Sequence, residues 1–104
     1  MVEIIDEASF EEKVLGAQGP VLVDFFSLHC MPCKKMEPVL EEVAEDYAGR
    51  MAVYKMEVGA CYMLAHALGV ESFPTFIVFE DGQRRATAIG PKPKEVLLDY
   101  LGLA

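Results

Sequence analysis

The chain contains no tryptophan and three cysteines, with nine lysine and arginine residues against 17 aspartate and glutamate residues. This scarcity of basic side chains, with a formal net charge of −8, argues against a nucleic-acid partner, because phosphate binding needs clustered lysine and arginine. Three is a small and odd number of cysteines, which argues against a secreted domain built on a disulfide framework. The acidity instead favours solubility.

Long hydrophobic runs are also missing, since no run approaches the roughly 20 apolar residues of a membrane span. The opening residues MVEIID lack the basic flank and apolar stretch of a signal peptide. We therefore expect a cytoplasmic protein without membrane attachment. Its 104 residues, 53% of them hydrophobic, are enough for a real core, so we expect a single domain over residues 1–104 and a monomer.

The most informative segment is Cys30-Met31-Pro32-Cys33, which lies between an apolar run and a charged amphipathic run. These runs predict a buried strand followed by a helix, so two thiols stand where a helix begins. The unpaired N–H groups and the positive end of the helix dipole favour a thiolate there. The spacing lets the sulfurs close a small disulfide ring, and Pro32 suits the first helical position, where the N–H it lacks would be unpaired.

Strand and helix signals alternate along the rest of the chain. Strands are predicted over residues 2–5, 21–26, 51–58, 75–80 and 83–89, and helices from Ser9 to Gly16, from Cys33 to about Ala48, over 61–68 and from Pro93 onward. The order βαβαβαββα predicts an α/β fold, a central mixed β-sheet with helices on both faces, with parallel pairing before a terminal hairpin. The cysteine motif then lies at the carboxyl end of a central strand, where open α/β sheets build their sites.

Several segments in the same order and spacing resemble the thioredoxin family over almost the whole length. They are VLVDFF at 21–26, CMPCK at 30–34, EPVL at 37–40, FPT at 73–75, DG at 81–82, and Gly90. The resemblance implies the thioredoxin fold and a dithiol–disulfide oxidoreductase that reduces protein disulfides, with no cofactor beyond the redox-active Cys30–Cys33 pair. It also implies two kinds of partner, disulfide-containing proteins and a recharging enzyme of the thioredoxin-reductase type.

The resemblance further implies catalytic roles. It implies that Asp24 is buried behind Cys33 and that Lys55 lies near Asp24. Cys30 is then the attacking thiolate that forms a mixed disulfide with the substrate, and Cys33 attacks the Cys30 sulfur to release the substrate. Asp24 suits the role of proton acceptor for Cys33, because burial raises a carboxyl pKa toward neutral pH while Lys55 moderates the rise.

The residues around the motif are expected to contact the substrate. They are His29, Met31, Pro32, Phe73, Pro74 and Gly90, with Pro74 implied to be cis and beside the cysteines. Three of them depart from the family pattern, because His29 stands where a tryptophan is usual, Met31 replaces a glycine and Phe73 is bulkier than usual. A protonated His29 would favour the Cys30 thiolate, and Met31 softens the apolar rim, so the substrate range is left open.

Other interpretations of the same residues stay open. The paired cysteines could be inert structural thiols, or could hold zinc or an iron–sulfur cluster with His29 or Cys61; a second spaced ligand pair is missing, so no metal is expected. Asp24 could be a buried carboxylate that is merely paired with Lys55. Cys61 is expected to be a packed apolar residue rather than a regulatory thiol. The domain could also be a thioredoxin-fold binding or scaffold module, or a specialised redox partner with a narrowed substrate range.

Overall fold

The computed structural model describes residues 2–103, so Met1 and Ala104, the ends of the expected domain, lie outside the described residues. The strands are β1 (Glu3–Ile4), β2 (Val21–Phe26), β3 (Ala52–Glu57), β4 (Thr75–Glu80) and β5 (Gln83–Ile89). The helical segments are α1 (Glu7–Phe10), its π-helical continuation η1 (Glu11–Leu15), α2 (Met31–Asp46), the short 3-10 helix η2 (Val58–Ala60), α3 (Tyr62–Ala67) and α4 (Lys94–Tyr100). This succession confirms the predicted α/β order, with boundaries that mostly agree within two residues.

The strands form one mixed sheet in the order β1-β3-β2-β4-β5. β2 lies at its centre and runs parallel to β3, while β4 runs antiparallel to both β2 and β5. The expectation of parallel pairing after each helix was wrong for β4. The segment 58–74 between β3 and β4, which contains η2 and α3, does not carry the chain back along the sheet. β4 therefore starts at the end of the sheet where β2 stops, with Thr75 opposite Phe25.

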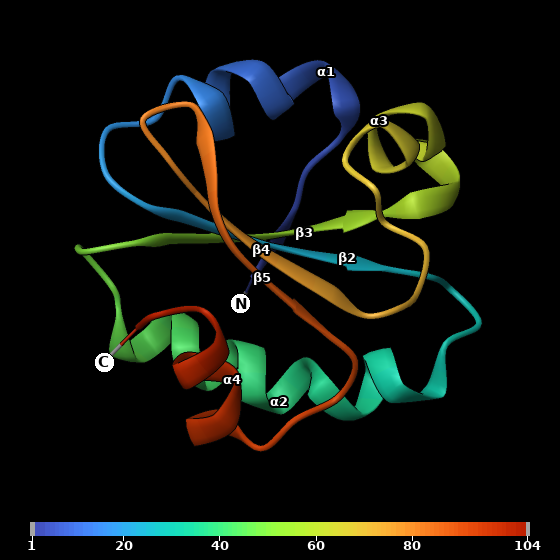
Figure 1. Ribbon diagram of the computed structural model, residues 1–104, viewed down its shortest axis with the longest axis vertical. Helices are drawn as coiled ribbons and strands as arrows, with labels where there is room; N and C mark the ends of the chain where they lie inside the picture. Colours follow the sequence, from blue (N-terminus) through green and yellow to red (C-terminus); the bar gives the residue numbers. More distant parts are fainter. Residues whose placement is uncertain (1, 104) are drawn as a thin grey trace.

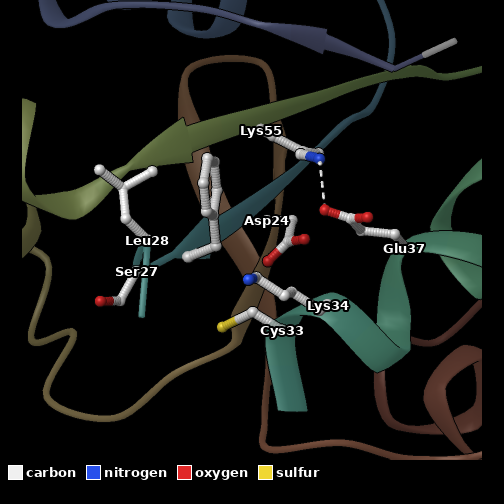
Figure 2. A pocket seen from close by; sticks show the side chains of 8 residues that line it. Asp24, Ser27, Leu28, Cys33, Lys34, Glu37 and Lys55 are labelled. Atoms are coloured by element: carbon white, nitrogen blue, oxygen red, sulfur yellow. Dashed lines mark ion pairs between the residues drawn. The ribbon is translucent and has the colours of Figure 1, made fainter. Parts of the chain in front are cut away.

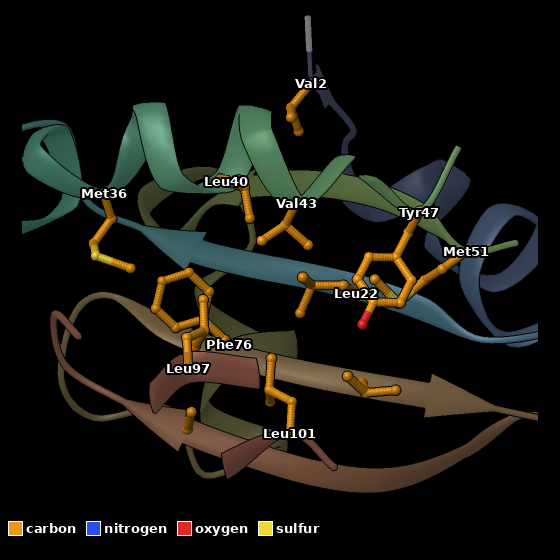
Figure 3. Close-up of a cluster of buried hydrophobic side chains, with 12 residues drawn as sticks. Val2, Leu22, Met36, Leu40, Val43, Tyr47, Met51, Phe76, Leu97 and Leu101 are labelled. Carbon is orange, nitrogen blue, oxygen red and sulfur yellow. The ribbon is translucent and has the colours of Figure 1, made fainter. Parts of the chain in front are cut away.

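Helices cover both faces of the sheet, α1 and α3 on one face and α2 and α4 on the other (Figure 1). Successive side chains of a strand point to opposite faces, so Leu22 faces α2 and α4 while Val21 and Val23 face the other layer. Figure 3 shows the first of these cores, in which Leu22 lies beneath Val43 of α2. The same alternation places Asp24 on the α2 face of the central strand.

The first helix begins before the predicted Ser9. Asp6 is its N-cap, and the Asp6 carboxylate accepts the Ser9 backbone N–H at 2.9 Å and the Ser9 hydroxyl at 2.9 Å. The prediction of a start at Ser9 was wrong because an aspartate caps a helix as well as a serine does, and Asp6 stands earlier in the chain. No helix within residues 2–103 is long and apolar enough to cross a membrane.

Candidate active site

The cysteine motif lies where the chain leaves the central strand and enters α2. Cys30 is the N-cap of α2 in an extended conformation, and its sulfur accepts the backbone N–H of Cys33 at 3.1 Å. Met31 is the first helical residue, so Pro32 takes the second position rather than the predicted first. A proline is tolerated at either position because N–H groups of the first turn have no partner within the helix.

The two cysteines form a disulfide, with their Cα atoms 5.2 Å apart. Cys33 is buried, with 4% of its surface exposed, whereas Cys30 is only partly buried. A partner can therefore reach the sulfur of Cys30 but not that of Cys33. This is the division that thiol–disulfide exchange requires, in which one sulfur meets the substrate and the other resolves the mixed disulfide.

A small cavity of about 100 Å³ lies behind Cys33. Figure 2 shows the side chains that line it, which come from β2, the loop after it, α2 and β3. They are Asp24, Phe26, Ser27, Leu28, Cys33, Lys34, Glu37 and Lys55. The cavity therefore joins the buried sulfur of Cys33 to the buried carboxyl of Asp24 on the central strand.

Asp24 is the titratable group at the base of this cavity. It is 1% exposed, and its Oδ1 atom has no hydrogen-bond partner within residues 2–103. Burial raises the pKa of the Asp24 carboxyl from 3.8 to about 7, against the lowering effect of Lys55 and with a further increase from Glu37. Near neutral pH the carboxyl can therefore both take up and release a proton beside Cys33.

Lys55 lies opposite Asp24 in the register of β3 against β2. Only 13% of its side chain is exposed, and its ammonium lies 3.6 Å from a Glu37 carboxylate oxygen and 5.1 Å from the centre of the Phe26 ring. Lys55 thus forms an ion pair with Glu37. Its charge lowers the pKa of Asp24 without an ion-pair contact between the two side chains. Sequence reasoning missed Glu37 as a site residue, although its spacing of four from Cys33 places both on one face of α2.

Comparison with known proteins decides the family, since the thioredoxin family model matches residues 1–102. The chain belongs to the thioredoxin family. It is 42% identical over 97 residues to the thioredoxin of Pseudomonas aeruginosa, covering 93% of this chain and 90% of that protein. It is 37% identical over 97 residues to thioredoxin 1 of Synechococcus elongatus, covering 93% and 91%.

The chloroplastic relatives are longer than this thioredoxin-family chain. It is 36% identical over 96 residues to the chloroplastic M-type thioredoxin of Pisum sativum, covering 92% of this chain and 56% of that protein. The chain thus spans about half the length of that relative. Family membership and the bonded Cys30–Cys33 pair together support dithiol–disulfide oxidoreductase chemistry.

The surface beside the thioredoxin cysteines is apolar. Met31 is 63% exposed and Leu28 is 59% exposed, and His29, which lies between Leu28 and Cys30, is also exposed. Met31 and His29 are two of the residues expected to contact the substrate, and Leu28 lies beside them in the chain and is exposed as they are. Exposed apolar side chains thus lie on both sides of Cys30 in the chain, Leu28 in the loop before it and Met31 at the start of α2.

Three more of the predicted contact residues lie at the ends of two other strands of the thioredoxin fold, Phe73 and Pro74 just before β4 and Gly90 just after β5. The Phe73–Pro74 peptide bond is cis, as the family resemblance implied. The Gly90 N–H donates to the Pro74 carbonyl at 2.8 Å, which ties the end of β5 to the start of β4. Gly90 has a φ of 90°, a conformation that favours glycine. The half-buried Phe73 packs against the core between the sheet and α3, so part of its ring is turned away from solvent.

The third cysteine is separate from the site. Cys61 is 2% exposed and its thiol donates to the Glu57 carbonyl at 3.4 Å. Burial raises the pKa of the Cys61 thiol, and the negative charges of Glu7 and Glu57 raise it further. Within residues 2–103, no three histidine, cysteine or acidic side chains come together as metal ligands.

Proposed function

We propose that this chain is a protein-disulfide reductase of the thioredoxin type. The observation that carries the proposal is the bonded pair formed by a reachable Cys30 and a buried Cys33, with Asp24 in the same cavity as Cys33. No bound cofactor is needed, because the family works through its cysteine pair. A recharging enzyme of the thioredoxin-reductase type supplies two electrons and two protons to reopen the disulfide after each turnover.

The exchange proceeds in two displacements. The Cys30 thiolate attacks one sulfur of a substrate disulfide, which breaks that S–S bond, expels the other sulfur as a thiolate and leaves a mixed disulfide. Cys33 then gives its proton to Asp24, and the resulting thiolate attacks the Cys30 sulfur. This step expels the second substrate thiolate and forms the Cys30–Cys33 bond.

Asp24 is proposed as the general base of the second displacement. A base works best when its pKa is near the operating pH, and burial brings the pKa of the Asp24 carboxyl to about 7. Lys55 supports this role because its positive charge opposes the effect of burial and keeps the carboxyl able to ionise.

Substrate binding is proposed on the surface around Cys30. The residues assigned to it are His29, Met31, Pro32, Phe73, Pro74 and Gly90. The large exposed fractions of Leu28 and Met31 favour a second candidate, a specialised redox partner with a narrowed range of disulfide-containing proteins. Such a protein uses the same chemistry with fewer partners.

The setting of the protein is also proposed. We assign residues 1–104 to a single domain that acts as a monomer in the cytoplasm, and we expect disulfide-containing proteins as its substrates. The Pisum sativum relative is described as chloroplastic, so a fractionation of the source cells tests the compartment directly.

Trapping the mixed disulfide tests the proposed function. Cys33→Ser leaves Cys30 able to attack but removes the sulfur that releases the substrate, so the variant accumulates covalent adducts with disulfide-containing proteins. Non-reducing electrophoresis followed by mass spectrometry identifies them. The matched control is Cys30→Ser/Cys33→Ser, which captures nothing if Cys30 is the attacking residue. A Cys33→Ser protein without adducts, or adducts that persist in the double variant, would contradict the mechanism.

A further inference from the structure

We propose that Glu37 is a positioning residue of the proposed reductase: its carboxylate holds the Lys55 ammonium in an ion pair at the mouth of the cavity, and this pairing controls how readily Asp24 accepts the Cys33 proton. The consequence for the reaction rests on the proposed function. The arrangement of charges does not, because it follows from the ion pair of Glu37 with Lys55 and from the cavity that both residues share with Asp24.

The fold brings Glu37 to this place from the helix above the sheet. Glu37 lies one turn after Cys33, so both side chains are on the face of α2 that covers the end of β2. Figure 2 shows the Glu37 carboxylate reaching from α2 toward the Lys55 ammonium, which rises from β3, with Asp24 between the two elements. All four side chains line the same cavity.

The charges that face Asp24 come from two elements. Lys55 comes from β3, and Lys34 and Glu37 come from α2, which also brings the uncharged sulfur of Cys33 into the cavity. On the other side of β2, the register neighbour of Asp24 in β4 is the uncharged Phe76. Of these groups, Lys55 lowers the pKa of Asp24 and Glu37 raises it.

Glu37 affects Asp24 in two ways that act in the same direction. Its negative charge disfavours a second negative charge in the cavity. It also pairs with Lys55, whose ammonium therefore contacts a carboxylate other than that of Asp24. Lys55 acts on the carboxylate of Glu41 as well. The Glu37 side chain is 55% exposed, whereas that of Lys55 is 13% exposed, so Lys55 is the less solvated member of the pair and the one that transmits the effect inward. Glu37 thus keeps Asp24 protonated to higher pH.

Glu37→Gln tests the proposal because glutamine keeps the side-chain size and removes the charge. We expect the midpoint of the Asp24 titration, read from its carboxyl carbon by NMR, to fall by about one pH unit. The matched control is Glu45→Gln, which makes the same charge change two turns further along α2, about 12 Å away. An unmoved midpoint in Glu37→Gln, or an equal fall in Glu45→Gln, would overturn the proposal.

A double-variant comparison tests the route through Lys55. Lys55→Met removes the ammonium, so the effect of Glu37→Gln on the Asp24 midpoint should shrink to less than half in the Lys55→Met background. A full-sized effect in that background would show that Glu37 acts on Asp24 directly and would overturn the positioning role.

The reductase pH profile connects the titration to the reaction. The acidic limb of the rate of Cys33-dependent release should move to lower pH in Glu37→Gln by the same amount as the Asp24 midpoint. A limb that stays in place while the midpoint moves would overturn the link between Glu37 and catalysis. The titration uses no substrate, so failure of the proposed function would appear separately, as an unmodified protein that does not reduce a model disulfide.

Discussion

Cys30 and Cys61 occupy the same formal position, since each is the N-cap of a helix at the end of the sheet where β2 and β3 stop. Their surroundings differ. The Cys30 sulfur accepts a backbone N–H from the first turn of α2, whereas Cys61 makes no such cap and its thiol donates to the Glu57 carbonyl. Cys30 is also partly exposed, and Cys61 is buried.

The difference shows that a helix start does not make a cysteine reactive by its position in the chain. A thiolate needs donors and access to solvent, and Cys30 has both, because the first turn of α2 donates an N–H to its sulfur and the residue is partly exposed. Cys61 instead lies in an apolar layer, where burial raises the pKa of its thiol and the negative charges of Glu7 and Glu57 raise it further. One residue type at the same kind of helix terminus is therefore a redox group in one place and a packing residue in the other.

The largest effect should appear in thiol alkylation. In the reduced protein at pH 7, Cys30 should react with iodoacetamide at least about a hundred-fold faster than Cys61, because its helix terminus favours the thiolate and it reaches solvent. Quenched mass spectrometry of the peptides measures both rates in one sample. Equal rates would break the comparison, and a urea-unfolded sample, in which both thiols are free, is the control.

A smaller effect is expected from Asp24→Asn, which compares the buried carboxyl of Asp24 with the buried thiol of Cys61. The pKa of Asp24 is about 7 in the folded protein against about 3.9 when unfolded, so unfolding releases a proton between these values and stability falls as pH rises through them. Asparagine does not titrate. The variant should therefore gain about 4 kcal/mol over the parent at pH 8 relative to pH 4.

Urea unfolding at both pH values measures this gain. A difference between variant and parent that does not change with pH would mean that Asp24 is not a neutral-range titrating group. Cys61→Ala serves as the control, since the raised pKa of its thiol keeps it protonated across the same pH window.

The smallest effect is expected from Cys61→Ala itself. Removal of one buried sulfur should cost about 1 kcal/mol of stability and leave the rate of disulfide reduction unchanged. Thermal unfolding and turnover of a model protein disulfide measure the two quantities. A clear loss of turnover would contradict the comparison, because it would show that Cys61 takes part in the reaction.

Local patterns were enough to predict much of the fold and part of the site. The β2 strand, the start of α2 and the position of the cysteine motif between them follow from apolar runs and helix periodicity, which depend on neighbours in the chain. The errors lie at Ser9, where a competing cap three residues earlier begins the helix, and at β4, whose direction depends on how far α3 carries the chain.

The order of strands and helices, and the placement of Cys30 and Cys33 at a strand-to-helix junction, were determined by the amino-acid sequence itself, because backbone hydrogen bonding and side-chain periodicity act over a few residues. The pairing of Glu37 with Lys55 above Asp24, and the burial of Cys61, were decided by the tertiary structure. These contacts join α2 to β3 and one helix layer to the sheet, and their strength depends on burial and distance across elements that are far apart in the chain.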